Sequence, residues 1–444
     1  MKQLAAGLIV SLSLVAALSA DDWPQWRGPT RDGVWRERGI IEKLPNPLPV
    51  VWRKPIGGGY AGPAVAQGKV FVTDRALGEG EKNPDDPFDK RSVEGKERVL
   101  CLDAATGNTT WTHEYTARYT ISYPFGPRTT PTVDGDRVYT VGAMGKLFAL
   151  AVKDGQVLWA KDYVADYKLR MNTWGISSAP LVHQTKVIAV VGGTDGAGVV
   201  AFGREGGKEL WRALSLEDPG YAPPVLIQSG GREQIIIWTP YSVASLDPET
   251  GKSLWDVPFK LDYALSVPTP IFIPETNRLL VTAFYNGSLM LQLDKEKPAA
   301  TVLWKGKKNS EKDTDGLHAI LCTPFHVDGH LYGVCSYGQL RCLKADTGER
   351  VWESLAATGS GRWWNAFLVP HADGRVFIAN EQGELITARL TPRGYVEESR
   401  APLIEPTGQA QRRKIVWSHP AFANRRIYAR NDKEIICVDL AVKP

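Results

Sequence analysis

Short apolar runs alternate with turn residues along almost the whole chain, and very few stretches show helical spacing. Each unit has the same order of signals: a stretch around a proline such as "TTPTV", a run such as "RVYTVGA", a glycine, and a run such as "KLFALAV". Strand-like runs of this length, separated by regular turns, predict an all-β protein.

A turn followed by a tryptophan recurs in each unit, as in "LDAATGNTTW" at residues 102–111. The Asp side chain accepts hydrogen bonds from backbone N–H groups two or three residues on, and the Gly adopts a positive φ at low cost. The Trp offers each sheet a large apolar contact on its neighbour. We therefore predict a structural role for Trp111, Trp159, Trp211, Trp255, Trp304 and Trp352.

The spacing of these tryptophans predicts a β-propeller. Counted from Trp52, successive members lie 44 to 59 residues apart, a period typical of propeller blades. Six blades end at a Trp, a seventh has Tyr395 at that position, and the eighth has only three strands at the C-terminus. We predict an eight-bladed β-propeller of four-stranded blades over residues 48–444. An N-terminal outer strand around Trp52 would join the C-terminal blade and remove the free edges.

The N-terminal residues predict export. Lys2 is followed by "LAAGLIVSLSLVAALSA", which is typical of a secretory signal peptide over residues 1–20, cleaved after Ser19 or Ala20. The alternative is an uncleaved anchor, although the run is short for a membrane span. The expected location is the periplasm or the exterior, with no transmembrane anchor in the mature chain. Residues 21–47 carry Trp23, Trp26 and Trp35, and we expect this arm to pack on the propeller.

Composition narrows the possible partners. The 444 residues are 43% hydrophobic and 23% charged, with a net charge of +4, as in an ordinary soluble domain. Because no basic block stands out, we expect no nucleic-acid partner. We also expect the protein to be a monomer.

The five cysteines have two interpretations. Cys101, Cys342 and Cys437 occupy the same place in three repeats, which favours small core residues, and no C-x-x-C motif indicates zinc or a c-type haem. Cys322 and Cys335 flank the turn "VDGH" at equal distances, so they could face each other across two strands. We state a Cys322–Cys335 disulfide as a hypothesis.

The segments that enter the innermost strands are rich in aromatic and polar residues, which predicts a ligand site at the mouth of the central channel. The predicted ligand- or cofactor-binding residues are Arg128, Trp174, Tyr221, Trp364, Asn365 and Trp417, and the same segments carry Tyr60, His318, Trp363 and His419. Aromatic rings with a cation suit a tricarboxylate quinone, a sugar acid or a peptide segment. The alternative is that these side chains only plug the channel. Asp195 and Glu381 are the candidate catalytic carboxylates.

The repeated "LDxxTGxxxW" resembles the pyrroloquinoline-quinone (PQQ) repeat propellers, the quinoprotein alcohol dehydrogenase-like group. The resemblance covers nearly the whole chain after residue 20, and "WPQWRGPTRDGV" is similar to the opening of exported bacterial members. The group includes PQQ-dependent dehydrogenases. It also includes the propeller lipoprotein of the bacterial outer-membrane assembly machine, which binds protein.

The family's dehydrogenases stack the quinone between a Trp and a disulfide of adjacent cysteines, and hold Ca²⁺ with Glu, Asn and Asp. This sequence has no adjacent Cys pair and no residue-by-residue match to the calcium set. The leading hypothesis is therefore an exported binding or scaffold protein with no metal site, whose partner is a protein, peptide or carbohydrate. The alternative is a PQQ-dependent dehydrogenase that oxidises an alcohol or sugar with PQQ and Ca²⁺.

Overall fold

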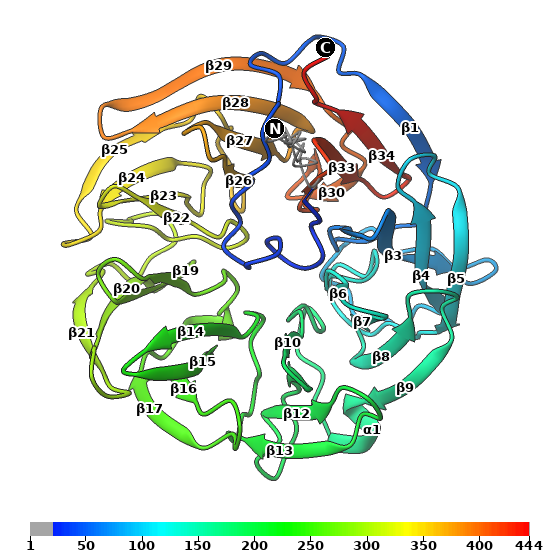
Figure 1. Ribbon diagram of the computed structural model, residues 1–444, viewed down its shortest axis with the longest axis horizontal. Helices are drawn as coiled ribbons and strands as arrows, with labels where there is room; N and C mark the ends of the chain where they lie inside the picture. Colours follow the sequence, from blue (N-terminus) through cyan, green and yellow to red (C-terminus); the bar gives the residue numbers. More distant parts are fainter. Residues whose placement is uncertain (1–20, 444) are drawn as a thin grey trace, which may run out of the picture.

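A computed structural model describes residues 21–443, so the predicted signal peptide at 1–20 lies outside the described part. Eight four-stranded antiparallel sheets surround a central channel (Figure 1), which confirms the predicted all-β, eight-bladed propeller. The described helical elements are α1 (Tyr163–Tyr167) and a 3₁₀ turn, η1 (Asp262–Ala264).

Seven blades are meanders of four consecutive strands, each ordered from the channel to the rim. The first three are β2 (Ala64–Ala66), β3 (Lys69–Leu77), β4 (Gly95–Asp103) and β5 (Thr109–Thr116); β6 (Thr132–Asp134), β7 (Arg137–Val141), β8 (Lys146–Ala151) and β9 (Val157–Asp162); and β10 (Leu181–His183), β11 (Lys186–Val190), β12 (Val199–Gly203) and β13 (Glu209–Ala213). The next two are β14 (Val225–Ser229), β15 (Arg232–Trp238), β16 (Ser242–Leu246) and β17 (Ser253–Pro258); and β18 (Ile271–Ile273), β19 (Arg278–Ala283), β20 (Gly287–Leu293) and β21 (Ala300–Lys305). The last two are β22 (Phe325–Val327), β23 (His330–Val334), β24 (Leu340–Lys344) and β25 (Arg350–Ser354); and β26 (Ala366–Pro370), β27 (Val376–Asn380), β28 (Glu384–Thr391) and β29 (Gly394–Pro402).

The eighth blade joins the two ends of the chain. It combines β32 (Ala421–Ala423), β33 (Arg426–Arg430) and β34 (Glu434–Asp439) with β1 (Val50–Pro55), and Trp52 lies opposite Cys437. The closure predicted around Trp52 is therefore confirmed. A separate hairpin, β30 (Gly408–Ala410) and β31 (Arg413–Ile415), precedes this blade.

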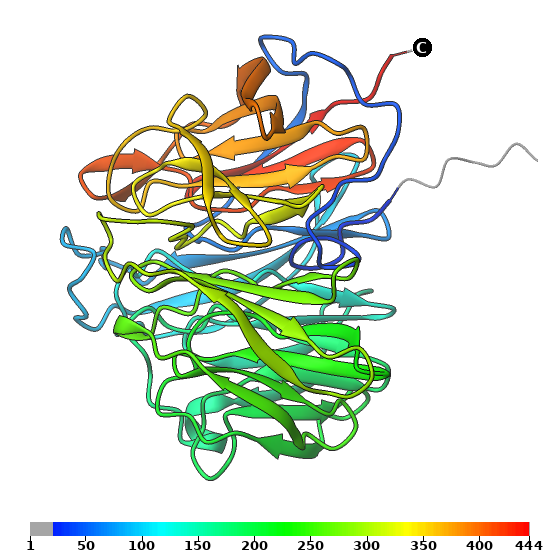
Figure 2. The same cartoon turned by 90° about the vertical axis from the view of Figure 1, so that its left-hand side faces the viewer.

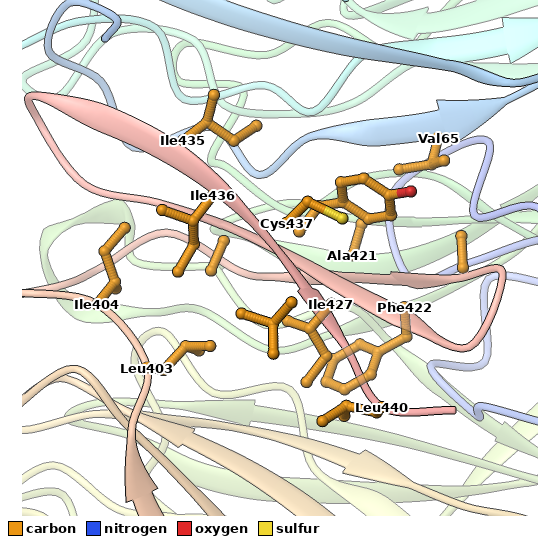
Figure 3. Close-up of a cluster of buried hydrophobic side chains, with 14 of the residues drawn as sticks. Val65, Leu403, Ile404, Ala421, Phe422, Ile427, Ile435, Ile436, Cys437 and Leu440 are labelled. Atoms are coloured by element: carbon orange, nitrogen blue, oxygen red, sulfur yellow. The ribbon is translucent and has the colours of Figure 1, made fainter. Parts of the chain in front are cut away.

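The closing blade is held by apolar packing on both faces. Figure 3 shows Ile435, Ile436 and Cys437 of β34 within one buried cluster, together with Val65 of β2 and Leu403 and Ile404 from the segment after β29. The cluster thus connects the eighth blade to its neighbours on either side, which stabilises the ring where the chain ends meet.

The repeated turn and tryptophan form the contact between successive blades. Trp111 Nε1 donates to the carbonyl oxygen of Val152 in the next blade at 3.0 Å, and its ring lies against Gly155. Gly155 has a φ of 74°, and a Cβ there would lie 2.6 Å from a Trp111 ring atom, so glycine is needed on both counts. The same pairing occurs at Trp52 with Gly107, Trp159 with Gly207, Trp211 with Gly251, and Trp304 with Gly348.

The other elements of the motif also follow the expectation. Asp103 Oδ1 accepts from the N–H groups of Ala105 at 3.1 Å and Thr106 at 2.8 Å. Trp255 differs from the other blade tryptophans, because its Nε1 donates to Gln234 Oε1 within its own blade at 2.8 Å and not to the next blade. The following blade there has the lengthened turn "LDKEKPAATVLW", which lacks the Gly.

The Cys322–Cys335 disulfide hypothesis is wrong, because all five cysteines are free thiols. The register around the turn agrees with the prediction, with Phe325 opposite Tyr332, but β22 begins only at Phe325, after Pro324. Cys322 then packs in the apolar cluster toward the next blade, and Cys335 in the cluster toward the preceding one. Cys101, Cys342 and Cys437 are fully buried strand residues, as predicted.

Residues 21–47 cross the ring on one face, as the dark blue segment in Figures 1 and 2 shows. Trp23 pairs with Val65 of β2, Trp35 with His371 after β26, and Ile40 with Ala441 at the C-terminus. The Trp23 and Trp35 side chains are 2% and 1% exposed. This segment therefore contributes to the buried cluster around the eighth blade, and its Trp26 reaches the channel.

Candidate functional site at the channel mouth

The connections between blades build the site. Each runs from the rim strand of one blade to the innermost strand of the next, and in seven of them a proline stands directly before that innermost strand, at residues 63, 131, 180, 224, 270, 324 and 420. Proline has a fixed φ and no N–H, so it suits the first position of an edge strand. Each of these prolines marks the point at which a connection becomes the innermost strand of the next blade.

A cavity of about 200 Å³ lies where the connections converge. All eight connections contribute to it, together with Trp26 of the N-terminal segment. Its lining comprises Trp26, Tyr60, Tyr123, Arg128, Thr130, Trp174, Ser177, Ala179, Tyr221, Pro223, Leu265, Val267, Ile320, Leu321, Trp363, Phe367, Trp417 and His419. Eight of these described residues are Trp, Tyr or Phe, and none is acidic.

Aromatic side chains form a collar on one side of the cavity. The Tyr123 ring centroid lies 6.1 Å from that of Trp363 and 5.9 Å from that of Trp417. Phe88, from the long insertion between β3 and β4, adds a fourth ring at 5.3 Å from Tyr123 and 5.8 Å from Trp363, and its side chain remains partly exposed. The insertion therefore reaches the rim of the cavity, opposite the face that the N-terminal segment covers (Figure 2).

Trp26 and His419 meet at the inner end of the cavity. Trp26 Nε1 donates to Thr269 Oγ1 at 2.8 Å, and its ring centroid lies 5.1 Å from that of His419. Burial lowers the pKa of His419 to about 4, an effect that Arg27 reinforces and the hydrogen bond to the Pro420 carbonyl opposes. The imidazole is therefore neutral at physiological pH and behaves as part of an aromatic wall.

Arg128 is the cation of the lining at neutral pH. Its Nη2 donates to the carbonyl oxygens of Ser122 at 2.9 Å and Tyr123 at 2.7 Å, and Nη1 donates to that of Gly126 at 2.9 Å. The guanidinium also lies 5.3 Å from the Tyr60 ring centroid. Much of its donor capacity therefore holds the connection in place, and less remains for a ligand. Burial raises the pKa of Tyr123 to about 12, so this tyrosine stays protonated.

Three polar atoms of the lining residues are buried without a hydrogen-bond partner among residues 21–443. They are Tyr123 Oη, Trp363 Nε1 and Thr130 Oγ1. Trp363 and Thr130 are 7% and 3% exposed. Buried donors in native proteins are nearly always paired, and an unpaired one costs about 1–3 kcal/mol. A ligand that accepts these hydrogen bonds would remove that cost.

The cavity brings together four of the six predicted binding residues and has the other member of one tryptophan pair in its lining. Arg128, Trp174, Tyr221 and Trp417 all belong to the lining, while Trp364 and Asn365 do not. Trp363 takes their place, with a φ of 62°. Trp364 pairs instead with Tyr337 in a parallel bridge and is buried below the surface, and the Asn365 N–H donates to Glu381 Oε2 at 3.1 Å. Nothing in "RWWNA" indicates which indole faces the channel.

The two candidate catalytic carboxylates lie outside the lining. Asp195 is on an exposed turn, 3.9 Å from Lys168 Nζ. Glu381 is 1% exposed and accepts from Trp417 Nε1 at 2.8 Å and from the Arg413 guanidinium. Both oxygens of Glu381 therefore have hydrogen-bond partners, and the bond to Trp417 Nε1 fixes the orientation of that indole ring.

The residues present do not fit a PQQ–calcium centre. In the described part of the chain, no group of three or more His, Cys, Asp or Glu side chains is arranged to hold a metal ion. PQQ carries three carboxylates, whereas Arg128 alone would face them in the lining, and its guanidinium already binds three backbone carbonyls. The lining therefore lacks the residues that a PQQ–calcium centre needs.

The described residues form an eight-bladed propeller with an aromatic cavity at one end of its channel. Comparison with known families makes the assignment specific. Residues 29–225 and 239–443 match the profile described as outer membrane protein assembly factor BamB, and the chain belongs to this family of PQQ-repeat propellers.

Its relatives include both an assembly factor and a dehydrogenase. The chain is 24% identical over 241 residues to outer membrane protein assembly factor BamB of Burkholderia pseudomallei, which covers 52% of this chain and 56% of that protein. It is 27% identical over 238 residues to quinohemoprotein alcohol dehydrogenase ADH-IIG of Pseudomonas putida, which covers 53% of this chain and 26% of the enzyme. The matches thus span about half and about a quarter of these relatives.

Solved structures show the same fold at low identity. BamB from Moraxella catarrhalis superposes with a TM-score of 0.58 at 13% identity, covering 88% of this chain and 99% of that chain. Quinohemoprotein alcohol dehydrogenase from Comamonas testosteroni gives a TM-score of 0.62 at 15% identity, covering 97% and 82%. These similarities establish the architecture alone.

Proposed function

We propose that this chain is an exported binding protein that holds an apolar or aromatic side chain of a protein partner in the channel-mouth cavity. The observation that carries the proposal is the lining itself, in which aromatic rings surround three unpartnered donors and no carboxylate is found among the described lining residues. Such a surface favours one buried anchor with a few oriented hydrogen bonds.

The cavity has the size of a side-chain pocket. A dry cavity of about 150 Å³ in another protein accommodates benzene, so about 200 Å³ leaves room for one aromatic or large aliphatic group. The Trp363 N–H and the Thr130 hydroxyl can donate to a carbonyl of the same residue, which favours a peptide. The eight connections around the cavity would supply the wider contact surface that a protein partner needs.

Export is part of the proposal. Residues 1–20 have the sequence of a secretory signal peptide, and the family profile is that of an outer-membrane assembly factor. In residues 21–443, we find no helix with the length and apolar character to cross a bilayer. We accordingly propose a periplasmic or secreted location.

The dehydrogenase alternative is favoured by one observation, the match to quinohemoprotein alcohol dehydrogenase over half of this chain. It requires a ligand set that the lining does not supply. The two functions therefore predict different ligands for the same cavity, and a binding experiment separates them.

The experiment is a selection of displayed random peptides against the purified mature protein. We expect enriched peptides to share an aromatic or large aliphatic residue and to lose binding to Trp363→Ala. Tyr241→Ala is the matched control, because Tyr241 is an exposed aromatic side chain outside the lining. Peptides that bind Trp363→Ala as well as the wild type would contradict the proposal. Saturable uptake of PQQ with Ca²⁺ would support the dehydrogenase.

A further inference from the structure

Glu37 is a buried carboxylate near the beginning of the described chain. Its residue is 6% exposed, and its Oε2 accepts from Trp35 Nε1 at 2.9 Å and from the Arg425 N–H at 2.8 Å. Its Oε1 accepts from the backbone nitrogen of Asp21 at 3.1 Å. Both oxygens are therefore occupied by neutral donors when the chain continues before Asp21.

This carboxylate has no side-chain counter-charge. Within residues 21–443, no Lys, Arg or His nitrogen lies within 4.0 Å of its oxygens, although many other carboxylates of this protein form such pairs. A buried charge without a partner is costly, and proteins normally pair it. Of the three groups that donate to Glu37, only the backbone nitrogen of Asp21 could become charged.

The geometry points to a processing site between Ala20 and Asp21, with the new α-ammonium of Asp21 forming an ion pair with Glu37. Water adds across the Ala20–Asp21 amide under a signal peptidase, giving the carboxylate of Ala20 and the amine of Asp21. That amine takes up a proton at neutral pH, because α-amino groups have a pKa of about 8. Hydrolysis thereby converts a neutral donor at 3.1 Å into the counter-charge of Glu37.

Residues next to the cleavage point support this assignment. The Asp21 carbonyl accepts from the Asn424 N–H at 3.2 Å, Asp22 Oδ2 accepts from the Gln67 N–H at 3.1 Å, and Trp23 pairs with Val65. The chain is thus anchored from Asp21 onward, and the nitrogen is fixed beside Glu37. The sequence allowed a cut after Ser19 or Ala20, and the Glu37 contact selects the second. The inference rests on the proposed export.

The first test identifies the N-terminus of the protein isolated from a secreting bacterial host by intact mass and N-terminal sequencing. We expect the chain to begin at Asp21. A processed chain that begins at any other residue would overturn this inference and leave export intact. A full-length chain retained in the cytoplasm would instead overturn export.

The second test measures the ion pair without any export step. The chain is released from a fusion partner with Asp21 as its first residue, or with one Gly before Asp21, each in the wild type and in Glu37→Gln. The added Gly moves the ammonium by one residue and leaves the Asp21 N–H as a donor. We expect it to lower the thermal midpoint of the wild type by about 1–3 °C, and to have much less effect in Glu37→Gln.

Glu42→Gln is the matched control, because Glu42 is an exposed carboxylate of the same N-terminal segment. The cost of the added Gly should persist in that background. An equal cost in the wild type and in Glu37→Gln, or no cost in the wild type, would show that the Asp21 ammonium does not pair with Glu37.

Discussion

Tryptophan is used in two different ways at the rim of the ring and at the channel mouth. At the rim, Trp111 packs on the Gly155 turn of the next blade, and its N–H is bonded to the Val152 carbonyl. At the mouth, Trp363 faces a cavity, and its N–H has no partner among residues 21–443.

The difference separates stability from binding. A ring packed on a neighbouring backbone, with its polar atom paired, stabilises the folded state and offers nothing to a ligand. A buried ring that borders empty space with an unpaired donor is a cost to the folded state that a ligand can offset.

The largest effect is expected at the rim. Trp111→Ala should lower the free energy of unfolding by about 3–5 kcal/mol, because it removes a large buried ring and leaves a cavity between two blades. Denaturant unfolding measures the loss. Peptide binding by the folded fraction should be unchanged, and a variant that unfolds like the wild type would show that rim packing is not what joins the blades.

His419 provides a test of the inner wall of the cavity. Its pKa is lowered to about 4 in the folded state, whereas unfolded His titrates near 6.5, so the unfolded state binds more protons between these values. Stability should therefore fall by about 3 kcal/mol as the pH drops from 6.5 to 4.

His419→Gln should remove this contribution and flatten the profile in that window. Urea unfolding at several pH values provides the measurement. At pH 8 the imidazole is neutral in both states, so the variant should differ from the wild type only by a packing cost. An unchanged slope between pH 4 and 6.5 would show that His419 is accessible to solvent.

Replacing tryptophan by phenylalanine compares the two regions directly. Trp363→Phe keeps a ring but loses the unpaired N–H, so peptide affinity should fall about tenfold with little change in stability. Trp111→Phe removes a paired N–H, so stability should fall by about 1 kcal/mol while affinity is kept. Titration calorimetry and denaturant unfolding of both variants provide the measurements. The distinction would be contradicted if Trp363→Phe lost stability and kept its affinity while Trp111→Phe lost affinity and kept its stability.

The smallest effect is expected from Thr130. Thr130→Val keeps the shape of the side chain and removes a buried hydroxyl that lacks a partner, so the free protein should gain up to about 1 kcal/mol of stability. The same variant should bind the selected peptides several-fold more weakly. A loss of stability in the ligand-free protein would show that the hydroxyl is already satisfied, for example by water.

The sequence predicted the architecture well because the repeat encodes contacts between neighbours. Each turn glycine must fit against the preceding blade's tryptophan, so the motif and its period together specify eight blades and their closure at Trp52. The candidate site was harder to predict. Arg128 and Trp417 could be placed at the channel mouth because they lie shortly before innermost strands.

The differences between these expectations and the structure have local physical causes. Which of Trp363 and Trp364 faces the cavity depends on the positive φ at Trp363, and nothing in "RWWNA" predicts that backbone conformation. The distance between Cys322 and Cys335 depends on where β22 stops pairing, not on the register of its turn. Glu381 was proposed as a catalytic carboxylate, but its burial behind Trp417 beside Arg413 arises from a hairpin distant in sequence.

Calorimetric titration of the mature protein with N-acetyl-tryptophanamide and, separately, with PQQ and Ca²⁺ tests directly which ligand the cavity binds. We expect saturable binding of the amide that weakens in Trp363→Ala but not in Tyr241→Ala, and no saturable binding of the quinone. Tight quinone binding that is lost in Arg128→Ala, with no binding of the amide, would contradict this expectation.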